Sequence, residues 1–222
     1  MSYINFENVT KEYVVGNNTK IKAVNQVNFE IEQGEFVVIL GASGAGKTTL
    51  LNLLGGMDSL SSGTIKVNKN LISSFDAKKM TLYRRNNVGF VFQFYNLIPD
   101  LTALENVELA TQDCDNPLDP KKSICDVGLE NRQNNFPSQL SGGEQQRVSI
   151  ARAIAKNPDI LLCDEPTGAL DSQTGQHIFS LLKSVATDRH KTVIVVTHNA
   201  EFAEFADRVI KMKDGQIEVR NN

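Results

Sequence analysis

A glycine-rich stretch, GASGAGKTT at positions 41–49, has the residue types that bind phosphate. It matches the phosphate-loop pattern from Gly41 to Thr48, with an apolar run before it and a predicted helix after it. Glycines let the backbone wrap an anion without a clash from a Cβ atom. Lys47 is then placed to contact the β- and γ-phosphates of a nucleotide, and the Thr48 hydroxyl to bind Mg²⁺. The alternative is a plain strand-to-helix turn, and the Lys-Thr pair with these flanks argues against it.

Two acidic residues close the apolar run ILLCDE at 160–165. A carboxylate at the carboxyl end of a strand, beside a phosphate loop, suits Mg²⁺, so we predict Asp164 as a metal ligand. Glu165 suits a different task, which is to orient or deprotonate the water that attacks the γ-phosphate. The alternative for the pair is an ordinary strand end with acidic caps, and the accompanying phosphate loop argues against that interpretation.

Three further side chains are weaker candidates. His198 follows the apolar run TVIVV and points to the same crevice, where it can hydrogen-bond the γ-phosphate; a loop or capping histidine is the alternative. Gln93 ends the segment VGFVFQ and is a candidate for sensing Mg²⁺ or the attacking water, although most glutamines are only solvated. Tyr13 is a candidate for stacking on a base, and packing is the alternative. For His177 and His190 we expect no functional role.

A second glycine-rich helix start, LSGGEQQR at 140–147, raises a question. Free backbone N–H groups and the helix dipole make such a start a phosphate site. Ser141, Gly142 and Gly143 therefore duplicate what the phosphate loop already offers. Either the chain binds two anions, or two copies face each other and each supplies these residues to the other's nucleotide.

Composition limits the class of protein. The chain has 222 residues, 41% of them hydrophobic and 22% charged, with a net charge of −3, which argues against a basic nucleic-acid surface. Cys114, Cys125 and Cys163 lack metal-ligand spacing and fit a reducing compartment. Since the apolar runs are too short to span a bilayer, we expect a soluble cytoplasmic protein whose membrane role comes through a partner.

Strand-like and helix-like segments alternate along the chain, which predicts an α/β fold with a mostly parallel sheet and helices on both faces. An antiparallel β segment comes first. Thr102 is predicted to cap a helix in a capping box with Glu105. The expected strands lie at 4–15, 23–31, 36–40, 63–68, 88–93, 160–165 and 191–198, with a final hairpin at 208–220. The expected helices lie at 47–56, 76–86, 102–110, 121–129, 142–155, 174–188 and 200–206, with a surface loop at 111–120.

The order of these motifs resembles that of the nucleotide-binding subunit of ATP-binding cassette (ABC) transporters, over nearly the whole chain. GASGAGKTT is similar to the Walker A loop, VFQFYNLIPDLTALENV to the Q-loop and LSGGEQQR to the signature. ILLCDEPT resembles the Walker B strand, ALDS the D-loop, VTH the H-loop, and Tyr13 stands at the aromatic A-loop position. The resemblance implies one ATP-binding domain over 1–222, a P-loop NTPase core with an N-terminal antiparallel β subdomain and a helical lobe at about 94–158.

The resemblance also implies the cofactors ATP and Mg²⁺ and a set of site residues. It favours the second answer to the question above: two copies pair head to tail, and each signature closes on the partner's Walker A loop. The implied catalytic residues are Glu165, His198, Lys47 and Gln93, and the implied metal ligands are Thr48, Gln93 and Asp164. The implied nucleotide contacts are Tyr13, Gly41, Ser43, Gly44, Ala45, Gly46, Lys47, Thr48 and Thr49, with Ser141, Gly142, Gly143 and Asp171 from the paired copy.

Within the family, LLGGMDSLSSG and DEPTGALDS look most like the ATPase subunits of the macrolide-exporter and lipoprotein-extraction group. That group implies an integral membrane permease partner with an extracytoplasmic domain, a place at the inner face of the cell membrane, and no nucleic-acid partner. The helical lobe is expected to be trimmed at 111–122. A soluble cassette ATPase acting on nucleic acid or ribosomes is the alternative, and a non-catalytic regulatory cassette is a third. The sequence indicates neither the cargo nor its direction.

Overall fold

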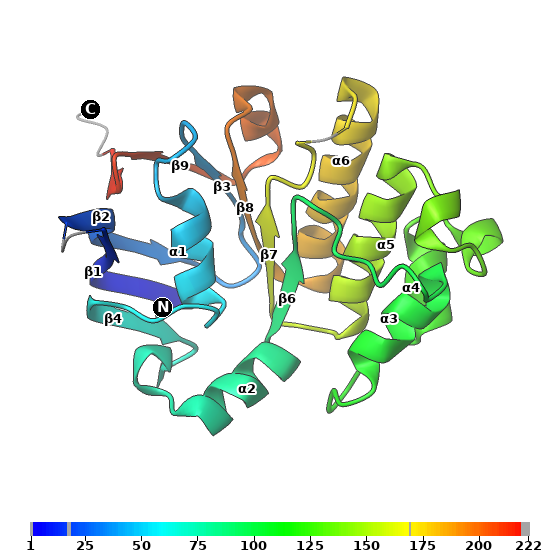
Figure 1. Cartoon of the computed structure of the whole chain (residues 1–222), viewed down its shortest axis with the longest axis horizontal. Helices are drawn as coiled ribbons and strands as arrows, with labels where there is room; N and C mark the ends of the chain where they lie inside the picture. Colours follow the sequence, from blue (N-terminus) through cyan, green and yellow to red (C-terminus); the bar gives the residue numbers. More distant parts are fainter. Residues whose placement is uncertain (1, 17–18, 169, 219–222) are drawn as a thin grey trace.

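A six-stranded sheet lies at the centre of the computed structural model, which describes residues 2–16, 19–168 and 170–218 (Figure 1). Its strand order is β10-β9-β3-β8-β7-β6, and only the β9–β10 pair is antiparallel. Because the carboxyl ends of parallel strands share one edge, the segments after β3, β6, β7 and β8 meet there. The strands are β3 (Phe36–Leu40), β6 (Val88–Val91), β7 (Ile160–Asp164), β8 (Thr192–Thr197), β9 (Arg208–Lys213) and β10 (Gln216–Ile217).

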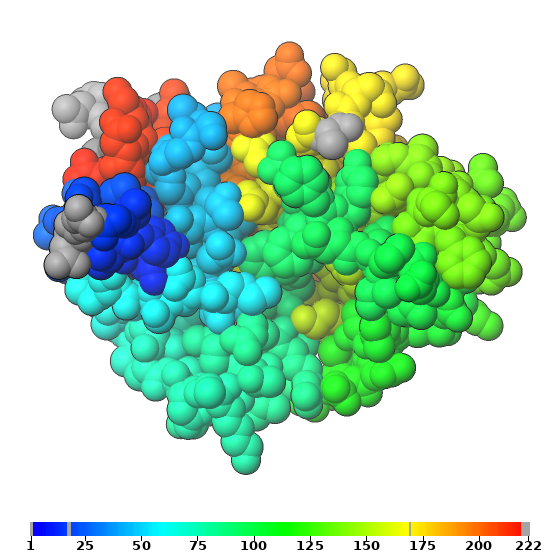
Figure 2. All heavy atoms as spheres, viewed as in Figure 1, coloured from blue at the N-terminus to red at the C-terminus, as the bar shows by residue number. Residues whose placement is uncertain are grey.

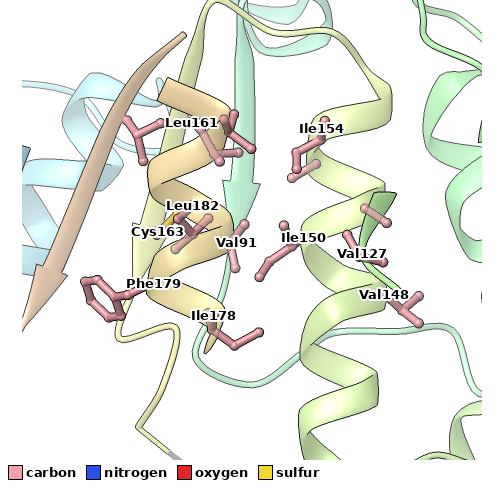
Figure 3. Packing of buried hydrophobic residues seen from close by; sticks show 14 of the residues in the cluster. Val91, Val127, Val148, Ile150, Ile154, Leu161, Cys163, Ile178, Phe179 and Leu182 are labelled. Atoms are coloured by element: carbon pink, nitrogen blue, oxygen red, sulfur yellow. The ribbon is translucent and has the colours of Figure 1, made fainter. Parts of the chain in front are cut away.

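Both faces of this sheet are covered, which explains why its inner strands read as continuous apolar runs. Val37 and Ile39 face α1 (Lys47–Leu54) and the N-terminal strands, whereas Phe36 and Val38 face α5 (Gly142–Ala155) and α6 (Ser172–Arg189). Figure 3 shows the second face, where side chains of α5 and α6 converge on β6 and β7. The mostly parallel α/β fold expected from the sequence is therefore confirmed.

A four-stranded antiparallel sheet stands beside α1, at the left of Figure 1. It contains β1 (Ile4–Val15), β2 (Thr19–Ile31), β4 (Ser62–Val67) and β5 (Asn70–Leu71), in the order β2-β1-β4-β5. The predicted first hairpin is confirmed, with Tyr13 opposite Ile21. Part of its predicted turn, residues 17–18, lies outside the described residues.

Three helices pack together at the right of Figure 1: α3 (Ala103–Thr111), α4 (Pro120–Asp126) and α5. The predicted capping box of Thr102 and Glu105 is present at α3, and the predicted loop joins α3 to α4. The remaining helices are α2 (Ala77–Asn86) and the short 3₁₀ turns η1 (Ile72–Ser74), η2 (Glu130–Arg132) and η3 (Pro137–Gln139). Within the described residues, no helix is long and apolar enough to cross a membrane.

The structure differs from the sequence expectation near the C-terminal end. The helix expected at 200–206 is present at Ala200–Phe205, and it is the 3₁₀ helix η4 rather than an α-helix. A 3₁₀ helix aligns side chains three residues apart. This aligns Phe202 and Phe205, whose ring centroids lie 4.0 and 5.6 Å from that of Phe179. Strand β6 also ends earlier than expected, so Gln93 lies beyond the strand.

Candidate functional site

An open cleft of about 600 Å³ lies at the carboxyl edge of the large sheet. In Figure 2 the cyan segment that contains the glycine-rich loop and α1 is exposed between the red C-terminal hairpin and the orange segment after β8. Strand β2 and the segments after β3, β6, β7 and β8 contribute to the cleft, as the parallel topology requires. Its lining residues are Ala23, Ala42, Ser43, Gly44, Gly46, Lys47, Thr48, Thr49, Gln93, Glu165 and His198.

The glycine-rich loop has a backbone shape that only glycine can adopt at two of its positions. Gly44 and Gly46 have φ angles of 81° and 97°, in the left-handed region. A Cβ atom on Gly46 would collide with the Ala23 carbonyl oxygen, and one on Gly41 would collide with that of Met212. The loop is also pinned by a hydrogen bond from the Gly215 N–H to the Ala45 carbonyl.

The start of α1 is open to an anion. Within the described residues, its N-cap Gly46 has no side-chain cap and its first turn holds no acidic residue. The N–H groups of this turn are those that a helix leaves without an internal partner. Together with the helix dipole, they give the cleft a site for phosphate groups.

Lys47 is folded back over this loop. Its side chain is buried, and its ammonium donates hydrogen bonds to the carbonyl oxygens of Gly41 (2.9 Å) and Ala42 (3.0 Å). The Nζ atom is 3.8 Å from Oε1 of Glu165. A buried cation needs such partners, and phosphate oxygens entering the loop can replace them.

The predicted metal ligands Thr48 and Asp164 lie side by side. The Thr48 hydroxyl donates to Oδ1 of Asp164 at 3.0 Å. Burial, assisted by the nearby charge of Glu165, raises the pKa of Asp164. Among the described residues, no group of three His, Cys, Asp or Glu side chains could hold a metal. One hydroxyl and one carboxylate nevertheless suit Mg²⁺, which takes few protein ligands and binds phosphate and water oxygens besides.

Glu165 lies between two positive or protonatable groups. Its Oε1 atom, which is 3.8 Å from the Lys47 ammonium, is also 3.0 Å from Nδ1 of His198. The backbone of Glu165 has a φ of 45°, which is rare for a residue with a side chain. Such strain is found at functional sites when the surrounding structure holds it in place. The side chain of Glu165 is 13% exposed and that of His198 is 64% exposed, so the pair opens toward the cleft.

Asp171 and Tyr13 are not among the described residues that line the cleft. Asp171 lines a neighbouring cavity of about 190 Å³ that also contacts Glu165 and His198. Its carboxylate caps α6 by accepting hydrogen bonds from the Thr174 N–H (3.0 Å) and hydroxyl (2.7 Å). Tyr13 is 38% exposed, and its hydroxyl donates to Oδ2 of Asp58 at 2.7 Å.

The second glycine-rich helix start lies elsewhere. Ser141 caps α5: its hydroxyl accepts from the Glu144 N–H at 3.3 Å, and Glu144 accepts from the Ser141 N–H at 2.8 Å. A Cβ atom on Gly142 would collide with the Tyr95 hydroxyl, and one on Gly143 would collide with the Thr174 methyl group. In the part of the chain that the structure describes, the lining of the cleft does not include Ser141, Gly142 or Gly143.

Sequence reasoning missed four residues of this region. Ala23 and Ala42 line the cleft, and Lys11 and Asp58 contact Tyr13. Alanines carry no chemical signal, and the partners of Tyr13 are identified only by the packing of β1 against the segment after α1. Apart from the α5 start, the predicted site residues that the structure describes and that do not line the cleft are Gly41, Ala45, Asp164, Tyr13 and Asp171. Gly41 and Ala45 adjoin lining residues in the chain, and Asp164 contacts the lining residue Thr48.

Comparison with known proteins gives consistent matches. The family model described as ABC transporter matches residues 24–168. The chain is 46% identical to the uncharacterized ABC transporter ATP-binding protein MJ0796 of Methanocaldococcus jannaschii, covering 97% of this chain and 95% of that protein. It is 44% identical to the macrolide export ATP-binding/permease protein MacB of Vibrio parahaemolyticus, covering 95% of this chain and 33% of that protein. The chain thus spans about a third of the macrolide export proteins that it matches.

Solved structures agree with these matches. A dimeric structure of MJ0796 in a post-hydrolysis state, bound to ADP and Pi, gives a TM-score of 0.89 at 44% identity and covers 97% of both chains. A second dimeric structure of MJ0796 gives a TM-score of 0.89 at 45% identity.

Proposed function

This chain belongs to the ABC transporter family, and we propose that its cleft is one half of a shared ATPase site that powers a macrolide-exporter-type membrane complex. The chain is an ATP-binding cassette and an ATP hydrolase. The observation that carries the proposal is the position of the Glu165 carboxylate, 3.8 Å from the Lys47 ammonium and 3.0 Å from the His198 imidazole, beside an open phosphate loop.

Phosphate binding rearranges the charges in this cleft. The triphosphate lies on the N–H groups of the loop and of the α1 start, and phosphate oxygens replace the two carbonyls that now accept from Lys47. Lys47 then neutralises the β- and γ-phosphates. Its attraction for Glu165 weakens as it turns to the phosphates, which leaves that carboxylate available to a water molecule.

The remaining groups assist the attack on the γ-phosphate. Thr48 and Asp164, with Gln93 from the loop after β6, would hold Mg²⁺, which supplies charge neutralisation when bound. Glu165 orients the attacking water and accepts its proton. His198, hydrogen-bonded to Glu165, faces the γ-phosphate. Tyr13 stacks on the base at the other end of the nucleotide.

A second copy of this chain completes the site. Ser141, Gly142 and Gly143 lie outside the cleft of their own chain, and a head-to-tail pair brings them to the cleft of the partner. Asp171, which lines the cavity next to Glu165, shapes the contact between the copies. The dimeric form of MJ0796, a relative of similar length, supports this arrangement.

The membrane partner is an integral permease with an extracytoplasmic domain, and the ATPase lies at the inner face of the cell membrane. The name of the MacB relatives, which joins ATP-binding and permease functions, supports the permease. Exposed apolar side chains of Phe94 (75%), Ile98 (40%) and Leu109 (45%) offer it a contact surface on the loop after β6 and on α3. We infer that 94–158, which contains the packed helices α3, α4 and α5, is the helical lobe that carries this surface.

The test of this function is the substitution Glu165→Gln. The amide keeps the shape of the side chain and removes its basicity, so ATP should still bind while turnover falls by at least 100-fold, on the order of a lost general base. Nucleotide affinity by calorimetry and single-turnover hydrolysis separate the two effects, and sizing in ATP should reveal a trapped dimer. Near-normal turnover would remove Glu165 from the general-base role, and strong salt-sensitive stimulation of the wild type by DNA or RNA would favour the nucleic-acid alternative.

A further inference from the structure

We propose that Asp58 and Lys11 are positioning residues that fix the Tyr13 ring so that one of its faces receives the nucleotide base. This inference rests on the proposed role of Tyr13 as the base-stacking residue. Lys11 and Tyr13 lie on β1, whereas Asp58 lies in the segment that follows α1, more than 40 positions from either of them.

The contacts among these residues form a closed triangle. Oδ2 of Asp58 accepts from the Tyr13 hydroxyl at 2.7 Å, and Oδ1 accepts from the Lys11 ammonium at 2.5 Å. The same ammonium donates to the Ser59 carbonyl at 2.8 Å and lies 4.9 Å from the centroid of the Tyr13 ring. Each member of the triangle therefore restrains the other two.

The position of Tyr13 makes these restraints necessary. The ring lies near the open end of the first hairpin, where Val14, Val15 and Ile21 are all more than half exposed. Side chains in such a place have few packing contacts to hold one rotamer, and a ligand that stacks on a free ring must order it first. A hydroxyl anchored on a carboxylate and a cation over the ring hold Tyr13 in place before the nucleotide arrives.

Lys11 also leaves only one face of the Tyr13 ring available for stacking. Its ammonium covers one face in a cation–π contact, while Lys11 itself is only 9% exposed. A base can therefore stack only on the opposite face.

Asp58 couples the ring to the phosphate loop. It lies just beyond α1, the helix that begins at that loop, and its N–H donates to the Asn52 carbonyl of that helix at 3.2 Å. Burial alone would raise the pKa of Asp58, but the hydrogen bonds from Lys11, Tyr13 and the Ser59 N–H lower it, so the carboxylate remains charged. The triangle thus sets the spacing between the base subsite and the phosphate subsite.

The chemistry of the triangle predicts its selectivity. Both carboxylate oxygens are engaged inside the protein, so Asp58 does not read the edge of the base. Stacking on an aromatic ring accepts any base, because every base has a π face. The triangle should therefore strengthen the binding of purine nucleotides in general and leave a triphosphate without a base unaffected.

The experiment measures the affinities of the purified wild type and its variants for ATP, GTP and inorganic tripolyphosphate, each with Mg²⁺, by calorimetry. Tyr13→Phe removes the hydroxyl–carboxylate bond and should weaken the binding of ATP and of GTP by the same factor, about threefold to tenfold. Asp58→Asn disrupts that bond and also the charge pair with Lys11, so it should weaken both nucleotides at least as much. The double variant should bind no more weakly than Asp58→Asn alone, because the hydroxyl–carboxylate bond is already lost in that variant. Lys11→Met should weaken both nucleotides by about twofold to fivefold through the lost cation–π contact. Tripolyphosphate affinity should stay at the wild-type value in all four, which also shows that they are folded.

Two controls make the outcome decisive. Glu7 lies on the same strand as Tyr13 and pairs with Lys66 of β4 at 3.2 Å, so Glu7→Gln breaks a comparable pair that does not involve Tyr13 and should change no affinity. Tyr13→Ala should weaken ATP by about 5- to 150-fold through lost stacking. If Tyr13→Ala binds ATP normally, the proposed role of Tyr13 itself is wrong. If Tyr13→Ala is weak while Asp58→Asn and Lys11→Met bind normally, or if Asp58→Asn weakens tripolyphosphate equally, only the positioning role is overturned.

Discussion

The helices α1 and α5 both begin in glycine-rich stretches, and their first turns differ in charge and in capping. The start of α1 has the glycine N-cap Gly46 in a left-handed conformation and lines the cleft. The start of α5 has a side-chain cap from Ser141, and Glu144 lies in its first turn. Hydrogen bonds from the backbone and side chain of Ser141 lower the pKa of Glu144, so a negative charge stands at this helix end, 3.2 Å from Arg132.

The difference shows that glycines alone do not make a phosphate site. At α1 the free N–H groups and the lysine ammonium act together, without an acidic side chain in the turn. At α5 a hydroxyl and a carboxylate already use two backbone N–H groups, and the carboxylate repels an anion. This difference fits the proposal that the α1 start binds phosphate within one chain, whereas the α5 start meets a nucleotide whose charge is already neutralised on another copy.

The largest expected effect is a loss of ATP affinity when the α1 start is altered. Lys47→Ala removes the cation that faces the β- and γ-phosphates, so ATP affinity should fall by on the order of 100-fold or more. Calorimetry measures it, and Lys78→Ala on the exposed side of α2 is the control that should bind normally. Unchanged affinity in Lys47→Ala would mean that the α1 start is not the phosphate site.

A substitution at the α5 start should impair hydrolysis rather than ATP binding. Ser141→Arg obstructs closure on the nucleotide of the partner, so each chain should bind ATP normally while hydrolysis falls by on the order of 100-fold. In an equal mixture of the Ser141→Arg and Lys47→Ala variants, each mixed dimer has both substitutions in one of its two shared sites. Its other site has neither substitution. By symmetry, about a quarter of normal activity should return if the sites are independent. Normal hydrolysis by Ser141→Arg alone would show that the two helix starts never share a nucleotide.

A smaller effect is expected from removing the charge of Glu144 in the first turn of α5. Glu144→Gln keeps an oxygen for the Ser141 N–H and removes the negative charge from the turn that we propose meets the γ-phosphate on the partner copy. ATP-dependent dimers of the Glu165→Gln variant should become about twofold to fivefold tighter, which is the scale of a charge at a helix end. Sedimentation velocity measures this, and weaker dimers would contradict the repulsion inferred for Glu144.

The smallest effect concerns stability alone. Ser141→Ala removes the cap of α5 and should lower the free energy of unfolding by about 1 kcal/mol in urea. The neighbouring exposed Ser138→Ala should change it by less than about 0.5 kcal/mol. Equal stabilities of the two variants would mean that the hydroxyl of Ser141 contributes nothing to the helix.

Local patterns predicted the parts of the fold that depend on local interactions. The capping box of Thr102 follows from spacing within one turn, and the final hairpin turns at Asp214 and Gly215, whose positive φ angles of 47° and 77° suit that pair. The apolar runs of β3, β7 and β8 predicted a parallel sheet. Each of these signals lies within a few residues, so no knowledge of the tertiary contacts was needed.

Features set by distant partners escaped prediction. The parallel pairing of β9 with β3 is a choice among strand neighbours that the hairpin pattern does not encode. The 3₁₀ form of η4 depends on Phe179, which lies on another helix. In the cleft, the motif residues were predicted by type and spacing, whereas the engagement of Tyr13 by Lys11 and Asp58 results from the packing of two separate segments.

The bracing of the glycine-rich loop has a consequence for the order of events during synthesis. Gly41 lies against the Met212 carbonyl, and the Ala45 carbonyl accepts from the Gly215 N–H, so the last hairpin forms one wall of the loop. At ribosomal rates of about 5–20 residues per second, that hairpin emerges roughly 10–30 seconds after the loop. Nascent chains therefore spend this interval without a finished phosphate cradle. Since a ligand stabilises the form that binds it, we expect ATP to protect a chain truncated before the hairpin from proteolysis less than it protects the full chain.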